Sequence, residues 1–198
     1  MKKIVICIDS FKGSLTSLSA GKAVAEAAEI VFPGVETVVL PLADGGEGTM
    51  DAILYAGGGE KVTIPVTGPL GNTIEASYGI LPQNKTAVIE MSAAAGITLV
   101  PKEELNPMIA TTRGVGEMIL DAISRGCRNF LIGIGGSATN DGGCGMMAAL
   151  GVRFFDGEGE EFVPTGATLE SIRKIDASGL RSELSECEIF VATDVKNP

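Results

Sequence analysis

Histidine and tryptophan are absent from this sequence of 198 residues. Without histidine, Ser-His-Asp and Cys-His mechanisms are excluded within the chain, and a general base near neutral pH must be Asp, Glu, Lys, Tyr or Cys. Cysteine is scarce: there are four, and none forms a Cys-x-x-Cys pair, so we expect no zinc site. The cysteines lie within apolar runs, which is typical of buried thiols in a reducing cytoplasm.

Basic residues are also few, with 15 Lys and Arg against 25 Asp and Glu, and the net charge of −10 argues against a nucleic-acid partner. No apolar run approaches the roughly 18 residues of a membrane helix, so no membrane partner is expected. The short apolar run before Asp9 predicts a first strand and not a signal peptide. We therefore expect a cytoplasmic globular protein that acts on a small molecule, and the sequence leaves its oligomeric state open.

Glycine is abundant, with 27 residues, and it gathers in short loops between apolar runs. Three loops, at residues 9–14, 44–49 and 133–145, each follow a predicted strand and lead toward a predicted helix. Ligands of open α/β sheets bind beyond the carboxyl ends of the strands, where glycine lets backbone N–H groups approach phosphate oxygens. None of the loops matches a Walker A motif, and any one of them is as well explained as a tight turn. Together they favour a phosphate site.

The pattern of apolar residues and turn signals predicts an α/β fold. Predicted strands cover residues 3–8, 35–42, 61–67, 73–80, 86–91, 129–134 and 188–193. Predicted helices follow residues 14–17, 49–51, 111–112 and the glycine loop before Met146. The β-α-β order at the start is typical of a doubly wound parallel sheet, whereas the three strands between residues 61 and 91 leave no room for helices and predict an antiparallel meander. We expect one domain from residues 1–66 and 107–198, with 67–106 as part of a smaller inserted domain.

Several polar residues are candidates for chemistry. Lys12 is the one basic residue of the glycine loops, and it is either a ligand for a carboxylate or phosphate or a solvated surface lysine. Asp194 follows the last predicted strand, and it is either the general base or a capping carboxylate. Asp141, in the third glycine loop, is either a residue of the site or a cap for the helix that contains Met146. Glu90 ends a meander strand and either lines a cleft or lies at the surface.

Six segments of the chain resemble the bacterial-type glycerate kinases in order and spacing. They are DSFKGSLTS (9–17), PLADGGEGT (41–49), VTGPLGN (66–72), IEMSAAAGI (89–97), GIGGSATNDGGCGM (133–146) and DVKNP (194–198). The resemblance implies transfer of phosphate from ATP to D-glycerate with help from Mg²⁺, giving 2- or 3-phosphoglycerate. It also implies a Rossmann-like domain with a smaller inserted α/β domain and an active site between the two.

The residues and the resemblance together give a candidate site, with metal ligands left unassigned. We assign catalysis to Asp194, Lys12 and Asp44. We assign substrate binding to Asp9, Ser10, Gly45, Gly46, Glu90 and Ser137, and phosphate or nucleotide binding to Gly135, Gly136, Asn140 and Asp141.

The chain departs from the family pattern in three places. Arg113 stands where many family members carry Tyr, Val163–Gly166 replaces a glycine pair, and the chain stops inside the last motif. We therefore expect further strands and part of the nucleotide pocket to lie beyond residue 198. The alternative to a kinase is a non-catalytic α/β module that binds phosphate or a phosphosugar.

Overall fold

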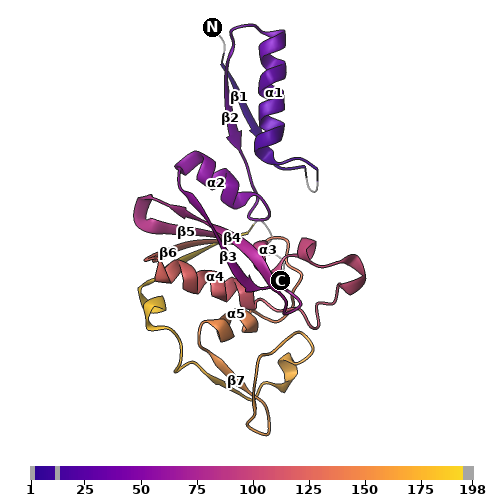
Figure 1. Cartoon of the computed structure of the whole chain (residues 1–198), viewed down its shortest axis with the longest axis vertical. Coiled ribbons are helices and arrows are strands. Elements are labelled where there is room, and N and C mark those ends of the chain that lie inside the picture. Colours follow the sequence, from indigo (N-terminus) through magenta and orange to yellow (C-terminus); the bar gives the residue numbers. More distant parts are fainter. Residues whose placement is uncertain (1–2, 12–13, 194–198) are drawn as a thin grey trace.

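A small N-terminal lobe stands apart from the rest of the molecule in the computed structural model, which describes residues 3–11 and 14–193 (Figure 1). In this lobe β1 (Lys3–Ile8) pairs in parallel with β2 (Glu36–Pro41), and α1 (Ser17–Val31) connects them. The buried Ser17 hydroxyl fixes the lobe's lower end, because it donates to the carbonyl of Ile8 at 2.5 Å and accepts from the amide of Leu42 at 3.1 Å. The carboxyl ends of β1 and β2 are thus held side by side.

A five-stranded mixed sheet forms the centre of the larger body, in the order β10-β6-β5-β4-β3. Its strands are β3 (Glu60–Thr67), β4 (Thr73–Leu81), β5 (Thr86–Glu90), β6 (Asn129–Gly133) and β10 (Glu188–Ala192). β3, β4 and β5 pair antiparallel, as the predicted meander requires, whereas β5, β6 and β10 run parallel. In the parallel register Glu90 lies opposite Gly133, and Gly133 lies opposite Ala192. Three strands therefore end at the same level.

The main core lies between this sheet and α4 (Arg113–Ser124), whose buried positions include Met118 and Ile119. Tyr78 is fully buried there, and its hydroxyl donates to Asp121 at 2.6 Å. Burial is the largest cause that raises the pKa of Tyr78, and the bond to Asp121 raises it further, so Tyr78 is a neutral core residue.

The remaining elements surround this core. They are α2 (Thr49–Gly57), α3 (Ser92–Ala95), α5 (Cys144–Ala149), β7 (Arg153–Phe155), β8 (Glu161–Phe162) and β9 (Lys174–Asp176), with 3₁₀ turns at Gln83–Lys85, Ile97–Leu99, Lys102–Glu104, Leu169–Ser171 and Ser182–Glu186. β7, β8 and β9 form a separate antiparallel sheet in the order β8-β7-β9, and residues 156–160 connect β7 to β8 as a hairpin. Among the described residues, no helix has the length and apolar character to cross a membrane.

The α/β class and every predicted strand are confirmed, and no strand end differs from its prediction by more than one residue. The sheets are connected differently from the expectation. The meander shares one sheet with β6 and β10, although the sequence suggested a boundary near residue 107, and β1 and β2 form a sheet of their own. The division into domains at 1–66, 67–106 and 107–198 stays a prediction.

Candidate active site

The carboxyl ends of β5, β6 and β10 meet the loop that follows β2. The amide of Met91 donates to the carbonyl of Gly133 at 2.9 Å, and the amide of Ile134 donates to that of Ala192 at 3.3 Å. The amide of Gly135 donates to the carbonyl of Gly45 at 3.2 Å, which attaches the loop after β2 to the loop after β6. Two of the three predicted glycine loops are therefore in direct contact, at the edge of the sheet where ligands of α/β proteins bind.

Glycine is required where these two loops touch. A Cβ atom on Gly133 would lie well inside contact distance of the Gly45 carbonyl oxygen, and one on Gly135 would lie 2.8 Å from the Cα of Gly46. Both neighbours are backbone atoms, which cannot move aside as a flexible side chain can. The glycines thus serve first to bring the two loops together.

Two amides of the loop after β2 donate to acceptors in the same loop or in the first residue of α2. The amide of Gly46 donates to Asp44 Oδ1 at 3.0 Å, and the amide of Gly45 donates to Thr49 Oγ1 at 3.1 Å. Gly45 is buried, whereas Asp44 is exposed. The structure places both glycines at the predicted site, and their contact with substrate stays a prediction.

The loop after β6 presents polar groups to solvent. Gly136, Ser137 and Asn140 are exposed, and Gly136 has a φ of +74°, which favours glycine. The Ser137 hydroxyl accepts from the amide of Thr139 at 3.0 Å. Gly136 and Asn140 were assigned to phosphate or nucleotide binding and Ser137 to substrate binding. All three are accessible to a ligand, and these roles stay predictions.

Asp141 lies inside this loop and not on its surface, with a relative exposure of 1%. Its Oδ2 accepts from the amide and hydroxyl of Thr112, both at 2.8 Å, and from the amide of Gly145 at 3.1 Å. Its Oδ1 accepts from the amide of Gly143 at 3.0 Å. This geometry favours the capping alternative over direct phosphate contact, because Asp141 joins the starts of α4 and α5.

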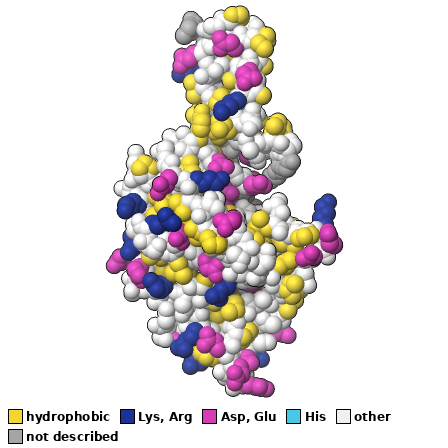
Figure 2. Space-filling view, viewed as in Figure 1, with side chains coloured by type: hydrophobic (Ala, Val, Ile, Leu, Met, Phe, Trp, Pro, Cys, Tyr) yellow, Lys and Arg dark blue, Asp and Glu magenta, His cyan; other side chains and the backbone are white. Residues whose placement is uncertain are grey.

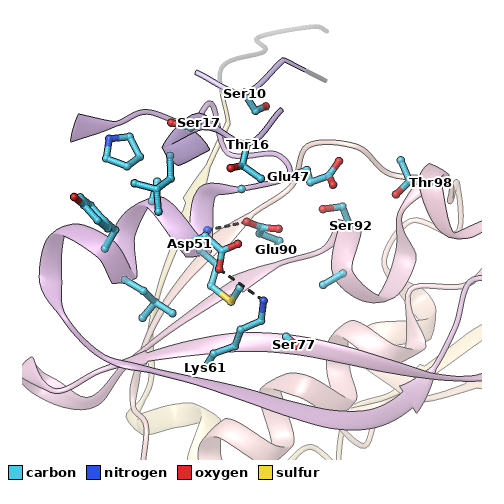
Figure 3. Close-up of a pocket in the computed structure, with 18 of the residues that line it drawn as sticks. Ser10, Thr16, Ser17, Glu47, Asp51, Lys61, Ser77, Glu90, Ser92 and Thr98 are labelled. Atoms are coloured by element: carbon cyan, nitrogen blue, oxygen red, sulfur yellow. Dashed lines mark hydrogen bonds and ion pairs between the residues drawn. The ribbon is translucent and has the colours of Figure 1, made fainter. Parts of the chain in front are cut away.

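A cleft of about 920 Å³ opens between the N-terminal lobe, α2 and the sheet (Figure 3). Figure 2 shows the surface hollowed where the lobe meets the larger body. Polar groups of its lining come from several elements: Ser10, Thr16, Ser17, Glu47, Asp51, Lys61, Ser77, Glu90, Ser92 and Thr98. The volume is in the usual range for small-molecule sites, roughly 300–1,000 Å³.

Ser10 and Glu90 are the predicted site residues that line this cleft, and most of its other lining residues were not predicted from the sequence. Lys61 and Ser77 lie on predicted strands, where alternation gives them a face but does not say that α2 crosses that face. Asp9 does not line the cleft, and its Oδ1 accepts from the amide of Ser10 at 2.6 Å. Lys12 and Asp194 lie outside the described residues.

Carboxylates dominate the charges that line the cleft. Glu47, Asp51, Glu75 and Glu90 are present, and among the described residues Lys61 supplies the one ammonium group, which pairs with Asp51 at 3.7 Å. An anionic substrate would be repelled by this wall unless further cations joined it.

Glu90 differs from the other carboxylates because it is buried, with a relative exposure of 8%. Its Oε1 accepts from the amide of Met50 at 2.7 Å (Figure 3). Burial raises the pKa of Glu90 above its ordinary value, which the amide of Met50 counteracts in part.

Comparison with known proteins gives consistent matches along the chain. A family model described as the glycerate kinase family matches residues 4–198. A glycerate kinase of Bacillus subtilis (strain 168) is 49% identical over 99% of this chain, and a glycerate 2-kinase of Escherichia coli (strain K12) is 48% identical over 99%. A crystal structure from Salmonella typhimurium LT2, of a protein described as a glycerate kinase 2, matches the whole chain with a TM-score of 0.87 at 45% identity.

The chain spans about half the length of these relatives. The match covers 51% of the two curated relatives and 54% of the Salmonella chain.

Proposed function

The chain belongs to the glycerate kinase family, and on this premise we propose that the full-length protein transfers a phosphate from ATP to D-glycerate. The observation that carries the proposal is the family match over residues 4–198. The meeting of two glycine loops and three strand ends beside a cleft supports it, because phosphoryl transfer depends mostly on positioning and electrostatics. The absence of histidine is compatible with such a reaction.

Each part of the site has a proposed task. The exposed loop with Gly135, Gly136, Ser137 and Asn140 binds phosphate groups or the substrate beside them. Asp9, Ser10, Gly45 and Gly46 form the side that receives glycerate. Lys12 supplies positive charge for the glycerate carboxylate or the transferring phosphate, which the acidic cleft wall does not supply.

The reaction needs a base for the attacking hydroxyl. We assign this role to Asp194, which accepts the hydroxyl proton as the oxygen bonds to the γ-phosphorus and the bond from that phosphorus to the ADP oxygen breaks. The products are ADP and phosphoglycerate. Asp44, exposed on the loop that contacts Gly135, is the proposed second carboxylate of the reaction.

Mg²⁺ is the proposed second cofactor. Within the described part of the chain, no group of three or more Asp, Glu or Cys residues is close enough to form a cage for a metal. Mg²⁺ is usually held by one or two carboxylates together with substrate phosphates, and the exposed carboxylate of Asp44 fits that mode. When bound, the ion would neutralise charge on the phosphate oxygens.

We place the transferred phosphate on the C2 hydroxyl, because the E. coli relative is named a glycerate 2-kinase. We also propose a cytoplasmic location, which is supported by four cysteines that are all free thiols.

The test is an assay of the full-length protein with ATP, Mg²⁺ and D-glycerate. We expect ADP formation that depends on glycerate, and a product whose phosphorus NMR signal is a doublet from coupling to the single C2 proton. A triplet would move the phosphate to C3. Phosphate binding without glycerate-dependent ADP formation would contradict a kinase and favour the non-catalytic module.

A further inference from the structure

Helix α2 begins without a cap of its own. Its N-cap residue is Gly48, with a φ of 94° and no side chain to accept a hydrogen bond. The hydroxyl of Thr49 is turned back into the preceding loop, where it donates to the carbonyl of Gly46 at 2.8 Å and accepts from the amide of Gly45. The amide of Met50 in the first turn therefore has no acceptor nearby in the sequence.

Glu90 supplies that acceptor from a different element. It is the last residue of β5, and its Oε1 accepts from the Met50 amide at 2.7 Å across 40 residues of sequence. Met50 and Glu90 are both buried. A hydrogen bond between a carboxylate and an amide in such surroundings is stronger than one between neutral groups, and the helix dipole adds to it.

Through this bond Glu90 connects the parts that meet at the candidate site. Glu90 lies opposite Gly133 in the sheet, and the loop it anchors through Met50 contacts the loop after β6 through the bond from Gly135 to Gly45. We propose that Glu90 is a positioning residue, which holds the start of α2 and the loop at residues 44–48 against the strand ends and does not bind substrate. The effect of this positioning on catalysis rests on the proposed function, whereas the structural role of Glu90 does not.

Direct contact between Glu90 and the substrate is disfavoured by charge. Glycerate and ATP are anions, and the carboxylates of Glu47 and Asp51 are the other charges that act most on Glu90 from the adjoining loop and from α2. The ammonium of Lys61 on β3 pairs with Asp51, and Glu75 on β4 lines the same wall. An additional buried negative charge here repels an anionic ligand but stabilises the positive end of a helix.

Stability should depend on pH through Glu90. Its pKa in the folded protein is raised above 4.5, so the folded state binds the proton more tightly than the unfolded state does. The stability that comes from the protonated form of Glu90 is fully present below pH 4.5, and it is lost as the pH rises through the higher pKa of the folded protein. Between pH 4 and 8, the melting temperature of the parent should therefore fall relative to that of Glu90→Gln as the pH rises. A difference that does not vary with pH would contradict the buried, titrating carboxylate.

The decisive experiment is amide hydrogen exchange in the full-length protein. Glu90→Ala should speed exchange at the Met50 amide by about tenfold or more, because the bond to a charged acceptor is lost. Glu90→Gln keeps an acceptor oxygen and should restore most of the protection, even if the alanine variant folds poorly. Glu75→Ala is the matched control, since it removes an exposed carboxylate from the same cleft and should leave α2 unchanged. Unchanged Met50 exchange in Glu90→Ala would overturn the proposal.

Kinetics separate positioning from binding. We expect Glu90→Gln to keep the KM for glycerate within about threefold of the parent while kcat falls, as for a group that acts through another. A selective rise in KM would assign Glu90 to substrate binding. If the parent shows no glycerate-dependent turnover, the proposed function fails, and the exchange data still decide the role of Glu90.

Discussion

Replacing Asp194 with Asn is expected to abolish glycerate-dependent ADP formation, with a loss in kcat of about 10²–10⁴-fold. The amide of Asn has nearly the shape of the carboxylate but cannot accept the hydroxyl proton. Asp194 lies outside the described residues, two positions after Ala192, which ends β10 beside the loop that follows β6. The measurement is steady-state turnover with glycerate varied, together with circular dichroism to confirm that the variant is folded.

The matched control is Glu158→Gln, which removes an exposed carboxylate from the hairpin between β7 and β8. Its turnover should equal that of the parent. Near-normal turnover in the Asp194 variant would show that another group is the base.

Replacing Gly133 with Ala should have the largest effect on the fold. The new Cβ would collide with the backbone of Gly45, and Gly133 is also held between Glu90 and Ala192 in the sheet. Overpacking of this kind costs about 1–3 kcal/mol, and more where neither neighbour can move. We expect the midpoint of urea unfolding to fall, and kcat/KM to fall with it by at least about tenfold, because the two glycine loops are forced apart.

Gly157→Ala provides the control for this substitution. A Cβ at Gly157 would meet only the Arg173 side chain, at 4.0 Å, so this substitution should leave stability and turnover unchanged. Equal behaviour of the two variants would mean that the contact between Gly133 and Gly45 does not hold the site together.

The order of elements could be predicted from the sequence because apolar runs and their turn signals are local. The runs at residues 3–8 and 129–134 became β1 and β6, and a glycine-rich or polar loop follows each of them. The contact between the second and third loops could not be predicted in this way, because β2 and β6 belong to different sheets.

The sequence could not show which contacts link distant residues. Nothing local to Glu90 indicates that it caps a helix 40 residues earlier. The burial of Asp141 likewise depends on Thr112, which comes from the start of α4. Lys61 and Ser77 belong to the cleft only because α2 and the N-terminal lobe lie over their face of the sheet. Such tertiary placement determined which candidates reach the cleft and which serve the packing around it.

We propose that the loops after β2 and β6, with the end of β10, form the site of phosphoryl transfer. A crystal structure of the full-length protein with a non-hydrolysable ATP analogue and D-glycerate tests it most directly. We expect the γ-phosphate to lie against residues 135–137, with a glycerate hydroxyl in line with it on the side of the cleft. A nucleotide bound away from these strand ends, for example on the sheet formed by β7, β8 and β9, would contradict it.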